Sequence, residues 1–151
     1  SEEQMDQWEE IKQEERELKK QSGILDGIAQ NLPALKRSQK IQKRAAKVGF
    51  DWPDSKGVFK KIKEEIRELE EAIESKDQES MKEEVGDLLM IITNLAYRLD
   101  VDSEEALKGS NEKFINRFSY IESKLNDSDK RFEDSSLALL DELWNESKKL
   151  G

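Results

Sequence analysis

Cysteine and histidine are both missing from this chain of 151 residues. Their absence excludes disulfides, thiolate or imidazole nucleophiles and an ordinary zinc site, so any catalysis must use carboxylates, lysine, tyrosine, hydroxyls or a hard metal ion. The sequence also has only two prolines, seven glycines and few β-branched clusters, which leaves little that favours turns or strands. We therefore predict an all-α fold, and the length is that of one domain.

Long apolar runs and an excess of basic residues are lacking as well. No stretch approaches the roughly 18 apolar residues of a membrane span. Ser1 is followed by acidic residues, whereas a signal peptide begins with basic and then apolar residues. These absences predict a cytoplasmic protein with no membrane partner. A formal charge of −9 would repel a nucleic-acid backbone, so we expect no stable nucleic-acid binding. An anionic substrate would need a cation, usually a metal ion, as mediator.

Charged residues make up 40% of the chain and apolar residues 34%, so the helices should be amphipathic. Apolar spacing predicts a charged helical lead-in over residues 1–20 and a linker to Pro33, then helices over about 32–48, 56–75, 78–99, 102–123 and 135–149. Ser80 and Glu83 have the spacing of a capping box. Two apolar stripes should face the core: Phe59, Ile62, Ile66, Leu69 and Ile73 in one helix, and Met81, Val85, Leu88, Leu89, Ile92, Leu95 and Leu99 in the next.

Acidic residues recur three apart in both of these helices. Glu65 and Glu68 lie beside the first stripe, and Glu84 and Asp87 lie beside the second. The short connection at residues 76–77 suggests antiparallel packing, which would let the two pairs converge. Four carboxylates held together repel one another, and a hard cation such as Mg²⁺ or Mn²⁺ would relieve that repulsion.

A chain with 35 acidic residues also produces such spacings by chance on solvated helix faces, and this alternative stays open. Gly86 lies between Glu84 and Asp87 and costs a helix about 1 kcal/mol relative to alanine. Close approach of a ligand or of another helix would explain a glycine at this position.

Several segments, taken in order and spacing, resemble the MazG family of nucleoside triphosphate pyrophosphohydrolases over roughly residues 31–123. They are Pro33-Ala34-Leu35, Gln39-Lys40, Arg44-Ala45-Ala46, Val48-Gly49-Phe50-Asp51-Trp52, Glu64-Glu65-x-x-Glu68, Glu84-x-x-Asp87-Leu88-Leu89 and Asn111-Glu112-Lys113-Phe114-x-x-Arg117-Phe118. Residues 140–144 resemble the closing helix of the family, and residues 8–12 resemble the end of the first half of two-domain MazG proteins. We therefore expect a missing N-terminal half, a lead-in and linker over residues 1–30, and a MazG-like catalytic domain over residues 31–151.

The resemblance implies an antiparallel helix bundle, a homodimer, and Mg²⁺-dependent hydrolysis of nucleoside triphosphates to nucleoside monophosphate and pyrophosphate. Glu65, Glu68, Glu84 and Asp87 match the metal ligands of the family. Glu64 would orient or deprotonate the attacking water, with a capping or surface role as its alternative. A catalytically silent module for dimerisation or nucleotide sensing is the competing function.

Basic and aromatic residues of the same motifs are candidates for substrate contacts. Lys113 and Arg117 share a helix face and would hold phosphate oxygens with Asn111 nearby, unless they pair with acidic neighbours. Lys40, with Arg44 one turn later, either contacts phosphate or forms a structural pairing, and both alternatives stay open. Trp52 would stack on a base or fill a core, and for Phe50 we favour the core.

Overall fold

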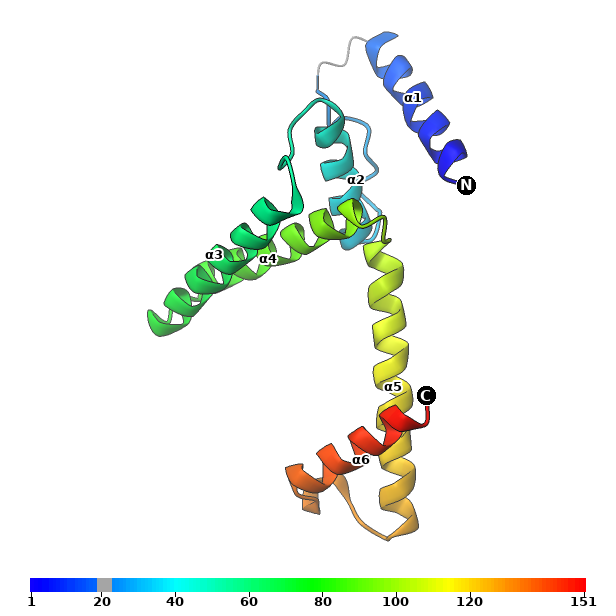
Figure 1. Ribbon diagram of the computed structural model, residues 1–151, viewed down its shortest axis with the longest axis vertical. Helices are drawn as coiled ribbons and strands as arrows, with labels where there is room; N and C mark the ends of the chain where they lie inside the picture. Colours follow the sequence, from blue (N-terminus) through cyan, green and yellow to red (C-terminus); the bar gives the residue numbers. More distant parts are fainter. Residues whose placement is uncertain (19–22) are drawn as a thin grey trace. The chain divides into compact units, whose positions relative to one another are not determined.

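A computed structural model describes residues 1–18 and 23–151 of the chain (Figure 1). The predicted all-α fold is confirmed, since no strand occurs among the described residues. The elements are α1 (Glu2–Leu18), α2 (Ala34–Lys47), α3 (Ser55–Glu74), α4 (Gln78–Arg98), α5 (Ser103–Asp127), the short 3-10 helix η1 (Phe132–Asp134) and α6 (Leu137–Lys149). Residues 19–22 of the predicted lead-in and linker lie outside the described residues. None of the described helices is long and apolar enough to span a membrane.

The described chain forms two compact units, Ser1–Glu104 and Glu105–Gly151. In the first unit, α4 packs against both α3 and α2. In the second, the buried core includes Ile121 and Leu125, beside an aromatic group in which the Phe118 and Phe132 rings stack with centroids 4.7 Å apart. The predicted division at residue 31 into a lead-in and a catalytic domain stays a prediction.

A tight turn makes α3 and α4 the antiparallel pair that the sequence predicts (Figure 1). Lys76 adopts a left-handed conformation with φ of 52° and reverses the chain between the helices. Asp77 then caps α4, because its carboxylate accepts hydrogen bonds from Ser80 N at 3.2 Å and from Ser80 Oγ at 2.8 Å. The predicted capping box of Ser80 and Glu83 is therefore wrong: α4 begins at Gln78, which places Ser80 inside the first turn.

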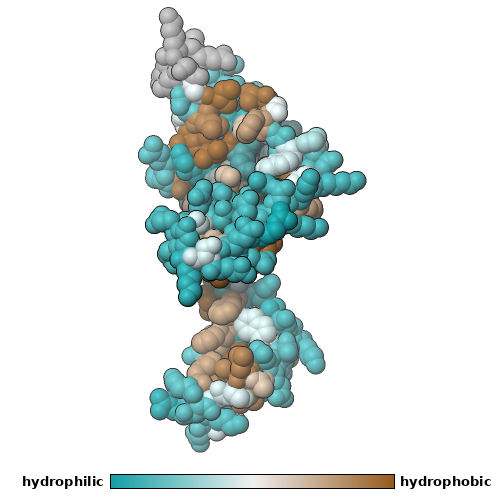
Figure 2. All heavy atoms as spheres, turned by 90° about the vertical axis from the view of Figure 1, so that its left-hand side faces the viewer, coloured by the Kyte–Doolittle hydropathy of each residue, from teal (hydrophilic) through white to brown (hydrophobic). Residues whose placement is uncertain are grey.

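The apolar stripes are only partly covered, which contradicts the expectation that they face the core. On α3 the buried residues recur every seven positions, at Val58, Glu65 and Ala72. Phe59, Ile66 and Ile73 occupy the next position of each repeat and are 51%, 44% and 54% exposed. On α4 the residues Val85, Leu89 and Ile92 are likewise exposed. Figure 2 shows hydrophobic side chains at the surface among hydrophilic ones.

Each helix of a two-helix hairpin covers only one side of its neighbour, and this accounts for the uncovered stripe. A side chain one residue further along points about 100° away, so it leaves the α3–α4 contact altogether. A wide apolar stripe therefore needs a second packing surface beyond the hairpin.

The contact between α2 and α4 contains a network of polar side chains. The Oγ1 atom of the buried Thr93 lies 2.7 Å from Ser38 Oγ and donates to the Met90 carbonyl at 2.7 Å. The amide of Gln42 donates to Thr93 Oγ1 at 2.7 Å and to the same carbonyl at 2.8 Å. Because these polar groups satisfy one another, their burial carries little penalty and fixes how α2 sits on α4.

Candidate metal centre

Three of the four predicted ligands converge between α3 and α4. Glu65, Glu84 and Asp87 each offer a carboxylate oxygen, and these oxygens all lie within 4.8 Å of one another. Glu65 belongs to the buried seam of α3 and is only 4% exposed, whereas Glu84 and Asp87, three apart on one face of α4, are half-buried. The antiparallel hairpin thus brings together acidic groups that are about 20 residues apart in the sequence.

Glu68, the fourth predicted ligand, lies outside this group of three and is exposed. Its carboxylate is nevertheless close enough to act on both Glu65 and Glu84, since its hydrogen bonding and charge contribute to their pKa shifts. The metal-ligand roles of all four residues stay predictions.

The electrostatics of the cluster lower the pKa of one carboxyl and raise that of a second. The hydrogen bond that Glu65 shares with Glu84 lowers the pKa of Glu65, and Lys61, whose Nζ lies 3.1 Å from Glu65 Oε1, lowers it further. The same hydrogen bond, together with burial and the charge of Glu65, raises the pKa of Glu84 to about 7. One proton shared between two carboxylates is the expected result when like charges are forced together.

Two buried oxygens of this pair have no hydrogen-bond donor. Among the described residues, Glu65 Oε2 and Glu84 Oε2 are buried and receive no hydrogen bond from the protein. An ionised carboxylate can only accept, so the carboxylates of the cluster cannot satisfy these atoms once all of them are ionised. A hard cation would satisfy both oxygens and replace the shared proton, and the donor set therefore fits Mg²⁺ or Mn²⁺.

Lys61 is a contributor that the sequence analysis missed. Besides its contact with Glu65, its Nζ lies 3.7 Å from Glu64 Oε2. The spacing of four residues between Lys61 and Glu65 on one helix was the available signal. Glu64 is half-buried beside the cluster, and its proposed action on water stays a prediction.

Gly86 has open space around it in the described chain. A β-carbon built at this glycine would meet no atom within 4 Å. Within the described residues of the unit Ser1–Glu104, no neighbouring helix packs closely against this glycine.

The predicted phosphate-binding residues lie on α5 in the second unit. Lys113 and Asn111 are exposed, whereas Arg117 is half-buried with its guanidinium 5.4 Å from the centre of the Trp144 ring. Within the described part of the chain neither Lys113 nor Arg117 forms an ion pair, and the buried Arg117 Nε has no hydrogen-bond partner. The alternative of pairing with acidic neighbours is thus not observed.

The loop before α3 is fastened to α4 by Asp51. Its Oδ1 atom accepts from Arg98 Nη2 at 2.9 Å and from Asn94 Nδ2 at 3.1 Å, and Arg98 also donates to the Trp52 carbonyl. Burial raises the pKa of Asp51, but the hydrogen bonds from Asn94 and Arg98 outweigh it, so the pKa lies below its usual value. Sequence analysis assigned this carboxylate no role, because nothing local indicates a partner more than 40 residues away.

The aromatic side chains of this loop differ from what we expected. Trp52 is half-buried, and its ring lies so close to Gly57 that a β-carbon there would be 2.8 Å from Trp52 Cδ1. Its packing on α3 agrees with the structural alternative for Trp52, and its contact with a base stays a prediction. Phe50 is 82% exposed, so our preference for a core position was wrong. The clamp at Asp51 positions the backbone without needing the Phe50 ring.

Lys40 and Arg44 extend from α2 toward α1. Lys40 Nζ lies 3.9 Å from Glu9 Oε1, and Arg44 Nη2 lies 2.7 Å from Glu9 Oε2. The structural pairing that we considered for both residues is therefore present. A phosphate-binding role for Lys40 stays a prediction.

Comparison with known proteins places this hairpin in a recognised domain. Residues 54–121, which include α3, α4 and most of α5, match the MazG nucleotide pyrophosphohydrolase domain. All three converging carboxylates fall within the matched residues.

Three curated relatives are similar over nearly the whole chain. The Thermotoga maritima nucleoside triphosphate pyrophosphohydrolase/pyrophosphatase MazG is 43% identical over 142 residues, covering 94% of this chain and 54% of the relative. The Escherichia coli K12 nucleoside triphosphate pyrophosphohydrolase is 44% identical over 144 residues, covering 94% and 55%. An uncharacterized protein of Bacillus subtilis, YabN, is 41% identical over 143 residues, covering 94% and 29%. The chain spans about half the length of the first two relatives. On these matches and on its helical hairpin, the chain carries a MazG nucleotide pyrophosphohydrolase domain over residues 54–121.

Proposed function

We propose that this protein hydrolyses nucleoside triphosphates to a nucleoside monophosphate and pyrophosphate, with Mg²⁺ as cofactor and Mn²⁺ as a substitute. The observation that carries the proposal is the meeting of Glu65, Glu84 and Asp87 with two donorless buried oxygens between them. The Thermotoga and Escherichia relatives are nucleoside triphosphate pyrophosphohydrolases, which supports the same reaction.

In this proposal Glu65, Glu84 and Asp87 hold the metal ion, and Glu68 completes the set from the exposed side. Lys61 keeps Glu65 ionised, which a ligand carboxylate requires. When bound, the ion supplies charge neutralisation at the phosphoryl oxygens and lowers the pKa of water.

The other residues act on the substrate and on water. Glu64 accepts a proton from the attacking water, whose oxygen forms a bond to the α-phosphorus. The bond from that phosphorus to the bridging oxygen breaks, and pyrophosphate leaves. Lys113 and Arg117 hold phosphate oxygens, because a pair four residues apart on one helix face can contact neighbouring phosphates.

A panel of nucleoside triphosphates, assayed for monophosphate and pyrophosphate, tests the reaction. We expect Glu65→Gln plus Asp87→Asn to abolish turnover, since two ligands are lost while side-chain size is kept. Glu70→Gln plus Glu71→Gln is the matched control on the exposed side of α3 and should leave turnover unchanged. Release of orthophosphate alone would contradict the proposal, as would equal activity in both double variants. Absence of Mg²⁺ binding by calorimetry at millimolar concentration would favour the catalytically silent module.

We also propose that two copies of the chain pair through the uncovered stripes of α3 and α4. A symmetric pair of hairpins forms a four-helix arrangement that covers both stripes at once, because a two-fold axis places the same surface on both sides. The stripes are long, regular and largely apolar, as in Phe59, Ile66 and Ile73. Such a surface suits a permanent partner better than a transient one.

Sedimentation equilibrium tests the pairing. Ile66→Glu places a charge in the centre of the stripe and should shift the protein from dimer to monomer. Lys60→Glu introduces the same residue at an exposed position about 120° around α3 and should leave the dimer intact. An unchanged dimer in Ile66→Glu would rule out this surface.

A further inference from the structure

Helices α1 and α2 carry opposite charge. The α2 segment contains six basic residues and no acidic one; they are Lys36, Arg37, Lys40, Lys43, Arg44 and Lys47. The α1 segment contains eight acidic residues, namely Glu2, Glu3, Asp6, Glu9, Glu10, Glu14, Glu15 and Glu17, against the two basic residues Lys12 and Arg16. In a chain of net charge −9, this is a concentration of positive charge on a single helix.

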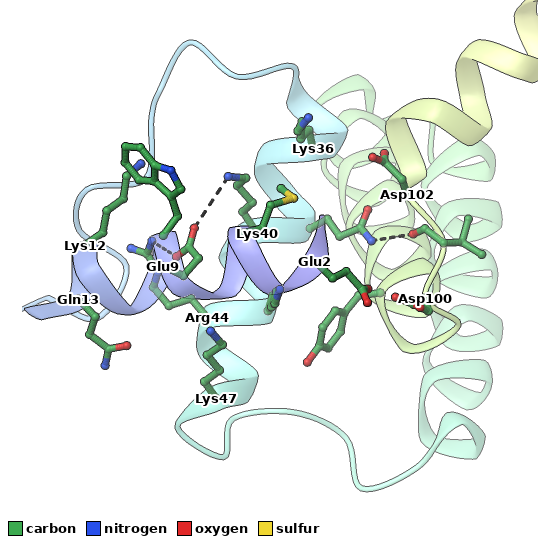
Figure 3. Close-up of a pocket in the computed structure, with 16 residues that line it drawn as sticks. Glu2, Glu9, Lys12, Gln13, Lys36, Lys40, Arg44, Lys47, Asp100 and Asp102 are labelled. Atoms are coloured by element: carbon green, nitrogen blue, oxygen red, sulfur yellow. Dashed lines mark hydrogen bonds and ion pairs between the residues drawn. The ribbon is translucent and has the colours of Figure 1, made fainter.

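Ion pairs hold the two helices together. Asp6 Oδ1 lies 3.0 Å from Lys43 Nζ, and the Glu9 carboxylate lies between Lys40 and Arg44 (Figure 3). Arg44 is buried and also donates to the Asp26 carbonyl at 2.6 Å. Apolar packing contributes little from the α1 side, because Met5, Trp8 and Ile11 all stay about half exposed or more.

A cavity of about 540 Å³ lies between these helices and the turn after α4. Six cationic side chains line it, and they are Lys12, Lys36, Lys40, Lys43, Arg44 and Lys47. Trp8 also lines it; this residue is 63% exposed, and Lys12 Nζ lies 5.1 Å from the centre of its ring. Glu2, Asp100 and Asp102 gather at one end, away from Glu9 (Figure 3). The volume is that of a typical small-molecule site, and ammonium and guanidinium groups are the usual partners of phosphate.

We propose that this cavity binds a polyphosphate group, and that Asp6 and Glu9 of α1 occupy its cations when no ligand is present. Phosphate oxygens take the place of Glu9 on Lys40 and Arg44 and the place of Asp6 on Lys43. The exchange is between like groups, carboxylate for phosphate, so the cations keep a partner in both states. The site uses none of the carboxylates of the metal centre and requires no metal or hydrolysis.

Two ligands share this chemistry, a nucleoside triphosphate and a free inorganic polyphosphate. The exposed face of Trp8 offers stacking to a base, which only the nucleotide carries. Comparison of the two ligands therefore identifies the source of the phosphate.

Isothermal titration of the full chain with tripolyphosphate and with ATP, in EDTA and low salt, tests the proposal. EDTA removes the metal ion that the acidic cluster would need. Binding to the cavity is therefore measured independently of the proposed hydrolysis. We expect Asp6→Asn plus Glu9→Gln to bind tripolyphosphate about tenfold more tightly than the unaltered chain, equivalent to about 1.4 kcal/mol. Glu14→Gln plus Glu15→Gln removes the same charge from exposed positions of α1 and should change the affinity less than about twofold.

Loss of binding in Lys40→Gln plus Lys43→Gln would support the site further. The proposal is overturned when the Asp6 and Glu9 variant binds no better than the Glu14 and Glu15 control, with circular dichroism confirming equal helix content. Binding that survives the double lysine substitution would also overturn it. Tighter binding of ATP than of tripolyphosphate, lost in Trp8→Ala, would assign a nucleotide, and equal binding would assign free polyphosphate.

Discussion

Lowering the pH from 8 to 6 should weaken Mg²⁺ binding at the acidic cluster about tenfold. The reason is competition between the metal ion and a proton for the same oxygens. Glu65 and Glu84 share a hydrogen bond, and the pKa of Glu84 is raised to about 7 as a result. A ligand carboxylate must be ionised, so the metal ion has to displace this proton.

The size of the effect follows from the fraction of Glu84 that is ionised. With a pKa of about 7, the carboxyl is about 90% ionised at pH 8 and about 10% ionised at pH 6. The ratio of these fractions is about nine, and it equals the loss of apparent affinity when one proton is displaced. Close to one proton should therefore be released per metal ion at pH 6, and about 0.1 at pH 8.

Calorimetric titration at pH 6, 7 and 8, in buffers of different ionisation enthalpy, measures affinity and proton release together. Glu84→Gln cannot be protonated in this range and should bind the metal weakly with little dependence on pH. The reasoning is refuted when the unaltered chain binds Mg²⁺ equally well at all three pH values and releases no proton. In that case the metal ion would not contact the Glu84 carboxylate.

Three further outcomes concern stability in urea denaturation. The pKa of Glu84 in the folded protein is raised from 4.5 to about 7. In the metal-free protein, the stabilising contribution of Glu84 to the free energy of unfolding is therefore fully present below pH 4.5, and we expect it to be lost as the pH rises through about 7. Asp51→Ala leaves the half-buried Arg98 without its carboxylate partner and should lower the free energy of unfolding by about 2 kcal/mol. A loss below about 0.5 kcal/mol would contradict the role of Asp51 in fastening the loop to α4. Gly109→Ala should raise the free energy of unfolding by about 1 kcal/mol, because α5 continues through this position and a β-carbon there would meet no atom within 4 Å. A lower free energy of unfolding would show that the β-carbon does not fit.

Sequence analysis predicted the features that depend on neighbouring residues. The helix positions follow from apolar spacing, and α3 and α4 begin and end within about two residues of the predicted ranges. The convergence of Glu65 with Glu84 and Asp87 was predictable for the same reason, since two residues in a turn allow only an antiparallel return. Helix geometry then places the acidic groups on facing sides.

Contacts between distant segments were decided by the tertiary structure. The hydrogen bonds of Asp51 to Asn94 and Arg98, and of Glu9 to Arg44, join residues more than 30 positions apart. A charged residue in an isolated sequence has many partners of opposite sign available to it. Only the packing of α2 and α4, and of α1 on α2, selects among them.

The sequence by itself determined that the chain is helical, where its helices lie and which faces of two successive helices carry Glu65 with Glu68 and Glu84 with Asp87, because helix periodicity is a local property. The tertiary structure decided which part of each apolar stripe is buried. Val58 and Phe59 are equally apolar neighbours in the sequence, yet one is fully buried and the other half exposed. The difference arises because periodicity gives the direction of a side chain, whereas burial depends on how many helices surround it.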